Sequence, residues 1–496
     1  MKRSAGIFLH ITSLPGSFGV GDFGYEARKF VDLLERTGVK IWQICPICPT
    51  AYGNSPYSTP CSNAGNPLLI SPELLRDWGY LKDDDLKEFG ERLPEEYVDF
   101  NRSFELKDRL IRKAFENFMP NEYYNKFCET ETWLDSYIMF LSLSKKFGTV
   151  NWSKWEKKYA SYNKNALVKY IKDNKKELDY YRFRQFIFHS QWFDLKKYAN
   201  ERGVRIFGDV PYYVSYESSD VWSNQNLFEL DSSGNMIRVG GVPPDYFSKD
   251  GQLWGTPLYR WDRIRENGNG GRRSGYEWWM NRMKRAFFYN DMVRIDHFRA
   301  FESYWAVDGK AQTAKEGVWK KGPGSDFFRA IRENLGSDIE LIAEDLGLIT
   351  QEVNELRDRE NLCGMKVFQF AFDGNKDNYY LPYNCTQKSV MYSGTHDNDT
   401  IMGWYGSLDE WAKKRVDDYV GGDGDILRRI IREVLASPSV YAILQLVDIL
   451  GFGSDARFNV PGTVDDRNWS WRFKWEWINE SVFDDFKKML TVFGRG

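Results

Sequence analysis

VRIDH, at residues 293–297, is an apolar, β-like run that ends in the carboxylate of Asp296. Two further runs in the same half of the chain also end in carboxylates: LIAED at 341–345 and SGTHD at 393–397. One acid at the end of a strand means little. Three such ends suggest a single site built from several parallel strands.

Short apolar runs of this kind recur along the chain, and we interpret eight of them as strands: 6–14, 40–46, 205–213, 292–297, 340–345, 365–370, 389–397 and 456–462. Segments with helical periodicity, such as 23–38 and 325–335, separate several of them. Alternation of strands and helices is typical of a parallel sheet, and eight units favour a closed (β/α)₈ TIM barrel over an open sheet. We therefore predict the α/β class and this barrel.

We predict one catalytic barrel domain over 1–496 with two large insertions. Residues 70–200 contain amphipathic stretches rich in charged and aromatic residues, which indicates a helical insertion subdomain. Residues 214–290 carry Gly and Pro clusters with aromatics, which is typical of a loop-rich insertion over the barrel mouth. The segment after residue 462 is too short for a C-terminal β-sandwich domain.

Composition excludes several classes of function. The 68 basic and 71 acidic side chains give a formal net charge of −3, so no electrostatic footprint for nucleic acid exists. No apolar run approaches the roughly 18 residues that a membrane span requires. The N-terminal apolar stretch is too short for a secretory signal. We expect a soluble, cytoplasmic protein.

Cysteines and aromatic residues are the other informative counts. Cys45 and Cys48 have the spacing of a redox or zinc half-site, but no second Cys/His pair lies nearby, so we predict free thiols. Aromatic residues make up 17% of the chain. Exposed aromatic side chains bind flat, uncharged ligands such as sugar rings.

The three acids are spaced for one face of the barrel. The chain allows one βα unit between Asp296 and Glu344 and two between Glu344 and Asp397, which would place all three at the C-terminal ends of the strands. Converging carboxylates repel, so their pKa values must separate, with one group protonated as an acid and one ionised as a nucleophile. Cleavage of glycosidic bonds requires this division.

Polar residues near these acids have two interpretations. Arg294 lies two residues before Asp296, so in a strand both side chains point to the same side and the guanidinium can keep Asp296 ionised. His10, His297 and His396 also fall at predicted strand ends. Any one of these residues alone is better explained as a structural ion pair or a buried histidine. The set together favours a site.

Longer motifs resemble a known family, the 4-α-glucanotransferases called amylomaltases or disproportionating enzymes, relatives of the α-amylases. The resemblance spans nearly the whole chain and rests on these stretches: HITSLPG near the start, 49–67, GDVPYYV at 208–214, GVPPDYFSKDGQLWGTPLY at 241–259, RIDHFRAF at 294–301, IAEDLG at 342–347, GTHDNDT at 394–400, and NVPGT with NWSWR at 459–472.

The resemblance implies roles for individual residues. Asp296 would be the nucleophile, Glu344 the general acid/base, and Asp397 the carboxylate that holds sugar hydroxyls and stabilises the transition state of a retaining reaction. Further residues would bind substrate: Tyr57, Asp209, Trp254, Arg294, His396 and Asn468. The substrates would be malto-oligosaccharides and α-glucans, with no cofactor and no metal.

Three departures from the family pattern are visible. Residues 58–63 (STPCSN) replace an aromatic-rich stretch, and Asp308 stands where the family commonly has proline. A remote glucan-binding site in some relatives uses two tyrosines, of which Tyr52 matches one while Phe100 occupies the place of the other.

Three functions remain to be separated. A glucanotransferase passes the intermediate to a sugar, an α-amylase-like hydrolase passes it to water, and a binding protein keeps only the aromatic cleft. The loop 240–259, with Tyr246 and Trp254, favours transfer because it can exclude water and provide an aromatic surface for the acceptor. The presence of all three acids argues against a binding protein.

Overall fold

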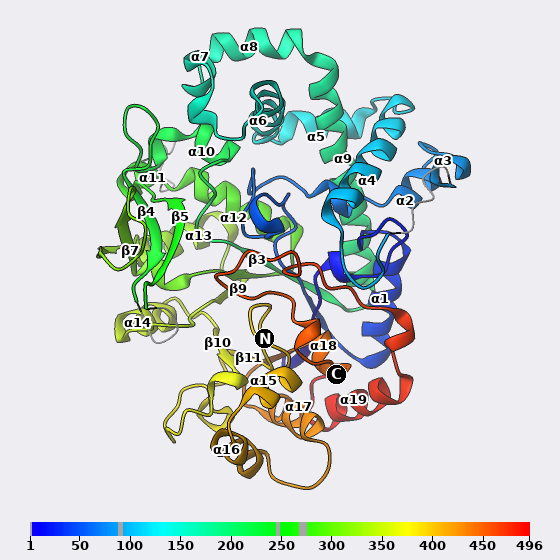
Figure 1. Cartoon of the computed structure of the whole chain (residues 1–496), viewed down its shortest axis with the longest axis vertical. Coiled ribbons are helices and arrows are strands. Elements are labelled where there is room, and N and C mark those ends of the chain that lie inside the picture. Colours follow the sequence, from blue (N-terminus) through cyan, green and yellow to red (C-terminus); the bar gives the residue numbers. More distant parts are fainter. Residues whose placement is uncertain (1, 88–92, 245–248, 267–274) are drawn as a thin grey trace.

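The computed structural model describes residues 2–87, 93–244, 249–266 and 275–496, and its centre is a sheet of eight parallel strands (Figure 1). The strands follow one another in the order β10-β11-β12-β1-β2-β3-β6-β9. Their bounds are β1 (Ser4–Phe8), β2 (Ile41–Gln43), β3 (Arg205–Val210), β6 (Met292–Ile295), β9 (Glu340–Ala343), β10 (Gly364–Val367), β11 (Ser389–Tyr392) and β12 (Tyr441–Gln445).

The sheet closes on itself between β9 and β10. Ile342 forms a parallel bridge with Cys363, and the Ala343 N–H donates to the Cys363 carbonyl at 2.8 Å. The predicted (β/α)₈ barrel is therefore confirmed.

Side chains from all eight strands fill the barrel interior as one apolar cluster. The packing leaves no room for a side chain at Gly6 on β1, because a Cβ atom there would be 2.5 Å from Ile443 and 2.8 Å from Ile41. The barrel is thus a packed core, and function is confined to its ends.

The prediction of the eighth strand was wrong. Ala456 ends the short helix η9 (Ser454–Ala456), and the rest of 456–462 is an irregular segment that contains Pro461 and Gly462. The eighth strand is β12, whose five residues are all buried. The strand continues directly into helix α18 (Leu446–Ile449), and the mostly apolar sequence of the two together gives a longer, helix-like pattern.

Helices surround the barrel and extend away from it (Figure 1). Helices α1 (Tyr25–Thr37), α12 (Glu277–Tyr289), α17 (Ile426–Ala436) and the long α9 (Lys175–Glu201) pack on or next to the barrel strands. The helices between β2 and β3 are α2 (Pro72–Asp77), α3 (Asp83–Lys87), α4 (Phe100–Glu116), α5 (Glu122–Thr130), α6 (Leu134–Phe147), α7 (Lys157–Ala160), α8 (Lys164–Asp173) and α9. The remaining ones are α10 (Ser219–Ser223), α11 (Trp261–Glu266), α13 (Ser325–Leu335), α14 (Gln351–Arg359), α15 (Ile401–Ser407), α16 (Glu410–Val420), α18 and α19 (Glu480–Val492).

A second sheet, which the sequence did not predict, lies beside the barrel. It is antiparallel, in the order β5-β4-β7-β8, and its strands are β4 (Arg238–Val242), β5 (Gln252–Pro257), β7 (Ser303–Asp308) and β8 (Gly317–Lys321). Two of these strands come from the stretch 214–290 and two from the chain after β6. The stretch predicted to be loop-rich therefore contains regular structure; its position over the barrel mouth stays a prediction.

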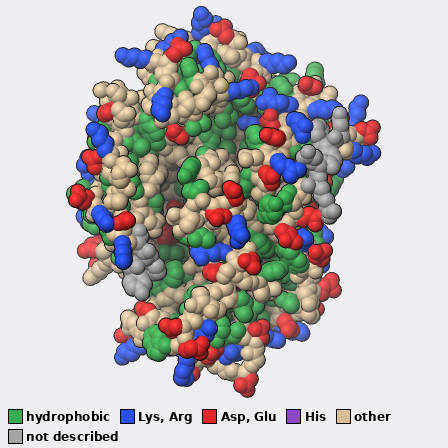
Figure 2. All heavy atoms as spheres, viewed as in Figure 1, with side chains coloured by type: hydrophobic (Ala, Val, Ile, Leu, Met, Phe, Trp, Pro, Cys, Tyr) green, Lys and Arg blue, Asp and Glu red, His purple; other side chains and the backbone are tan. Residues whose placement is uncertain are grey.

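Two expectations from composition meet the structure here. All six cysteines are free thiols, as predicted for Cys45 and Cys48. Among the described residues, none of the helices has the length and apolar character needed to cross a membrane. Basic and acidic side chains are interspersed over the face shown in Figure 2.

A buried ion pair anchors helix α4 to the loops of the barrel. The ammonium of Lys107, 1% exposed, contacts the Asp22 carboxylate at 2.6 Å and donates to the carbonyls of Leu68 and Ile70 at 2.8 and 3.0 Å. Burial lowers the pKa of Lys107, and the charge of Asp22 opposes this change. One side chain of the helix thus contacts two loops.

We expect Lys107→Met to lower the free energy of unfolding by about 3–5 kcal/mol, because it leaves the Asp22 carboxylate buried without its cation. Urea denaturation monitored by circular dichroism measures this loss. The double variant Lys107→Met/Asp22→Asn should recover part of it. A single variant as stable as the parent chain would show that the pair contributes nothing.

Candidate active site

The first two acids lie side by side at the C-terminal ends of neighbouring strands. In the parallel register Ile295 of β6 faces Ala343 of β9, and Asp296 and Glu344 are the next residues. The Glu344 N–H donates to the Ile295 carbonyl at 3.1 Å, so the ladder continues to the acids themselves. Strand pairing alone therefore fixes the relative position of these two backbones.

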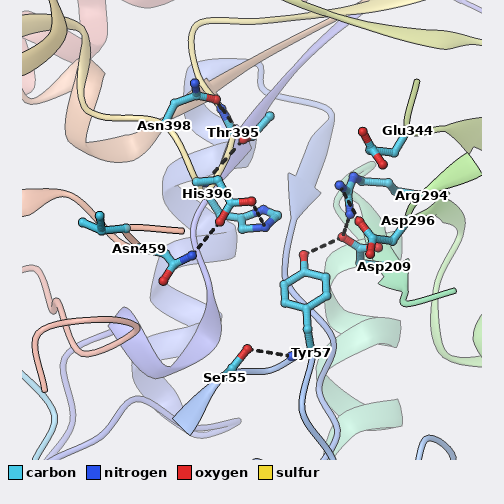
Figure 3. A network of polar contacts seen from close by, with 12 residues as sticks. Ser55, Tyr57, Asp209, Arg294, Asp296, Glu344, Thr395, His396, Asn398 and Asn459 are labelled. Carbon is cyan, nitrogen blue, oxygen red and sulfur yellow. Dashed lines mark hydrogen bonds and ion pairs between the residues drawn. The ribbon is translucent and has the colours of Figure 1, made fainter. Parts of the chain in front are cut away.

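Arg294 connects the acids to a third strand. Its buried guanidinium contacts Asp209 on β3 at 2.6 Å and Asp296 at 2.8 Å (Figure 3). The predicted pairing of Arg294 with Asp296 is confirmed. The hydroxyl of Tyr57 donates to the same Asp209 at 2.8 Å. One cation thus holds two carboxylates from different strands, and Tyr57 is drawn into the same group.

Glu344 has a different environment. Its two oxygens accept the backbone N–H groups of His297 at 2.7 Å and Leu346 at 2.9 Å. Burial raises the pKa of Glu344 to about 7; the negative charge of Asp296 adds to this rise, and the charge of Arg294 opposes it. Glu344 can therefore hold a proton near neutral pH.

Asp296 is the partner that ionises first. Burial raises the pKa of Asp296 as well, and the charge of Arg294 opposes that rise. Because Asp296 forms a direct ion pair while Glu344 accepts only from N–H groups, the first proton to leave the pair leaves Asp296. The site thus favours one ionised and one protonated carboxyl group, as a nucleophile and an acid require.

Asp397 lies in the loop between β11 and α15. One of its oxygens accepts from Asn459 Nδ2 at 2.6 Å, and the other lies 3.4 Å from His396 Nε2. The side chain is 44% exposed. The His396 ring stacks on the Tyr57 ring at 5.1 Å, which links this loop to the group around Asp209 (Figure 3).

Trp254 comes from the second sheet. It lies on β5, partly exposed, with its ring 4.8 Å from that of His297 and 6.0 Å from that of Tyr213. Its indole N–H donates to Gln252 Oε1 at 3.2 Å. The structure therefore places Trp254 against the residue that follows Asp296. Tyr246 lies outside the described residues.

Asn468 is used within its own loop. Its side chain accepts from the Val460 N–H at 3.0 Å and donates to the carbonyl and hydroxyl of Thr463 at 3.2 and 3.0 Å. These bonds hold the loop that carries the neighbouring Asn459. A direct role of Asn468 in binding sugar stays a prediction.

The predicted remote glucan-binding site involves Tyr52 and Phe100, which differ in exposure. Tyr52 is 74% exposed, in the short helix η2 (Tyr52–Asn54), whereas Phe100 begins α4 and is partly buried against apolar neighbours. Glucan binding at Tyr52 and Phe100 stays a prediction.

Sequence reasoning missed two contributors to the site. His297 adopts a left-handed conformation, with φ of 50°, which turns its N–H toward Glu344. Asn459 holds Asp397. A signal existed for Asn459, because it opens the NVPGT motif; for His297 the residue type was noted, but its backbone conformation has no sequence signature. Within the described part of the chain, no cluster of three or more His, Cys, Asp or Glu residues forms a metal site.

The barrel and its acids define a class of protein: a (β/α)₈ enzyme that carries two unlike carboxyl groups at the C-terminal ends of its strands. A family model described as 4-alpha-glucanotransferase matches residues 9–478. The chain belongs to this family of enzymes.

Individual relatives agree. A 4-alpha-glucanotransferase of Clostridium butyricum is 40% identical over 98% of this chain and 100% of its own length, and that of Aquifex aeolicus is 40% identical over 99% of both. Among solved structures, the amylomaltase of Streptococcus agalactiae in complex with acarbose has a TM-score of 0.95, 36% identity and full coverage of both chains. An amylomaltase of Corynebacterium glutamicum, 17% identical with a TM-score of 0.80 over 99% of this chain and 75% of its own, shares the fold.

We expect kcat/KM for a malto-oligosaccharide donor to fall as the pH rises through about 7. The reason is that Glu344 must be protonated to act as an acid, and it loses its proton in this range. Initial rates measured from pH 5 to 9 test this. The residual rate of Glu344→Gln should not fall as the pH rises through about 7. If the fall persists in this variant, a group other than Glu344 causes it.

Proposed function

We propose that this member of the 4-alpha-glucanotransferase family moves α-1,4-glucan segments between malto-oligosaccharides through a covalent glucosyl–enzyme, with retention at the anomeric carbon. The observation that carries the proposal is the unlike pair on adjoining strands. Asp296 is paired with Arg294, whereas Glu344 accepts only N–H bonds and has a pKa raised to about 7. Retaining glycosidases require this difference between nucleophile and acid.

In the first half of the reaction, an oxygen of Asp296 attacks the anomeric carbon of the donor sugar. The bond from that carbon to the glycosidic oxygen breaks, and Glu344 gives its proton to the departing oxygen. Arg294 keeps the attacking carboxylate ionised and, through Asp209, holds it in place.

In the second half, the 4-hydroxyl of an acceptor sugar attacks the same carbon. Glu344, now ionised, takes the hydroxyl proton, and the bond to Asp296 breaks. Two inversions leave the original configuration. Glu344 regains the proton that it gave up in the first half, so the reaction requires no cofactor.

The remaining residues would bind the donor sugar. Asp397 is partly exposed and fixed by Asn459, which suits a carboxylate that holds sugar hydroxyls as the transition state forms. Tyr57 and His396 form a stacked pair beside it, a surface of the kind that sugar rings contact. The amylomaltase of Streptococcus agalactiae was solved with acarbose, which supports a glucan-like ligand at this site.

Hydrolysis is the second candidate, because the same intermediate can react with water. Trp254 favours transfer: its ring rests on His297, next to Asp296, where it gives an acceptor sugar an apolar surface and reduces the access of water. A cytoplasmic location stays a prediction.

We expect maltotriose alone to be converted into a ladder of longer oligomers together with glucose, because each transfer needs both a donor and an acceptor. Chromatography of the products over time shows the ladder. Glucose and maltose without longer products would indicate a hydrolase, and unchanged maltotriose would favour a binding protein.

We expect Glu344→Gln to lose turnover of maltotriose but to be glycosylated by α-maltotriosyl fluoride, because fluoride departs without a proton while the second step still lacks its base. Mass spectrometry should then find the sugar attached to Asp296. The matched control is Asp296→Ala, which should form no adduct and lose several orders of magnitude in rate, as removal of a nucleophile does elsewhere. An adduct on another residue would contradict the assignment.

A further inference from the structure

Asp397 depends on a loop whose two ends must be fixed. The chain leaves β11 at Tyr392 and re-enters regular structure at Ile401, the first residue of α15. Asp397 stands in the middle of this connection, partly exposed at the site. A carboxylate that acts on sugar hydroxyls has to be held to within about 0.5 Å of its productive position.

A single buried side chain contacts both ends of the loop. Asp448 lies on α18, directly after β12, the strand that pairs with β11. The Ser393 hydroxyl donates to Asp448 Oδ2 at 2.6 Å, and the Ile401 N–H donates to Asp448 Oδ1 at 2.7 Å. Each oxygen of one carboxyl group thus fastens one end of the segment that carries Asp397.

The burial of Asp448 lowers the stability of the folded protein. Asp448 is 1% exposed, and no cation pairs with it among the described residues. Burial raises the pKa of Asp448 to about 7; the Ser393 hydroxyl and the Ile401 N–H oppose this rise, while the negative charge of Asp399 adds to it. A buried carboxyl group with only neutral partners destabilises the fold relative to an apolar residue.

The middle of the loop is held by other bonds. Arg457 donates to the Asp397 carbonyl at 2.6 Å, and Gln369 donates to the Asp399 carbonyl at 2.7 Å. Asn398 accepts from the N–H and hydroxyl of Thr395 at 2.8 and 2.9 Å (Figure 3). Ser393 also donates its N–H to the Ile443 carbonyl at 3.1 Å, and Ile401 begins helix α15. Loss of Asp448 would therefore loosen the two ends while the loop stays attached, which predicts a shift of Asp397 and not an unfolded loop.

We infer that Asp448 is a positioning residue: it clasps Ser393 and Ile401 and thereby holds Asp397 in place for the reaction. The inference rests on the role proposed above for Asp397. Asp448 itself acts through the loop, with no contact to the sugar.

The test is a double-mutant cycle on kcat/KM for maltotriose. We expect Asp448→Ala to reduce kcat/KM by roughly 10²-fold, the loss that a displacement of about 1 Å can cause. In an Asp397→Asn background the same substitution should cost less than about 3-fold, because its target has already lost its charge. Asp448→Asn should retain most of the activity, since its amide still accepts from Ile401 and can donate to Ser393.

Ser393→Ala is a second variant, which removes the bond to Asp448 at only one end of the loop. We expect a smaller loss of kcat/KM, which should again be reduced in the Asp397→Asn background. Lys107→Met is the control for lost stability, since it should lower the melting temperature without changing kcat or KM at a temperature where the fold is intact. All variants are compared below their melting temperatures.

Each outcome bears on a different claim. The positioning role of Asp448 would be wrong if Asp448→Ala caused equal losses of kcat/KM in both backgrounds. It would also be wrong if Asp448→Ala caused no loss in the parent chain while Asp397→Asn was impaired. Full activity of Asp397→Asn would contradict the proposed role of Asp397, on which the positioning role of Asp448 rests.

Discussion

The buried guanidinium of Arg294 is the interaction on which the site depends. It lies on β6 between two strands and binds Asp209 and Asp296 at once. The position follows from the barrel, because Asp209 of β3 faces Arg294 in the parallel register and side chains two apart on a strand point the same way. The fold therefore brings one cation to two carboxylates, one within β3 and one directly after β6.

This cation also decides how charge is divided. Asp209, Asp296 and Glu344 lie around one arginine, and three ionised carboxylates there would leave an excess of negative charge in a poorly solvated place. Asp209 and Asp296 bond directly to the guanidinium, whereas Glu344 has only two backbone N–H donors. The remaining proton therefore belongs on Glu344. The division between nucleophile and acid is a result of contact geometry, and residue type does not determine it.

Local sequence was enough for the barrel and for the acids that end β6 and β9, because a buried parallel strand and the polar residue after it are neighbours in the chain. Prediction from local sequence failed where residues distant in the chain determine the structure. β12 is a strand because β1 and β11 pair with it on either side, and its apolar run alone reads equally well as helix. The second sheet joins segments separated by the nucleophile strand. The roles of the three acids came from family resemblance. The NVPGT motif drew attention to the segment of Asn459, but no pattern in the sequence predicted that Asn459 bonds Asp397.

The second sheet connects Asp296, the proposed nucleophile, to Trp254, the proposed acceptor surface. After Asp296 the chain turns through His297 in a left-handed conformation and continues through η6 (Phe298–Phe301) into β7. β7 pairs with β4, and β4 pairs with β5, the edge strand that carries Trp254. Trp254 returns to rest on His297, whose N–H holds Glu344. Trp254 and Glu344 thus contact the same residue, Trp254 through the His297 ring and Glu344 through the His297 N–H.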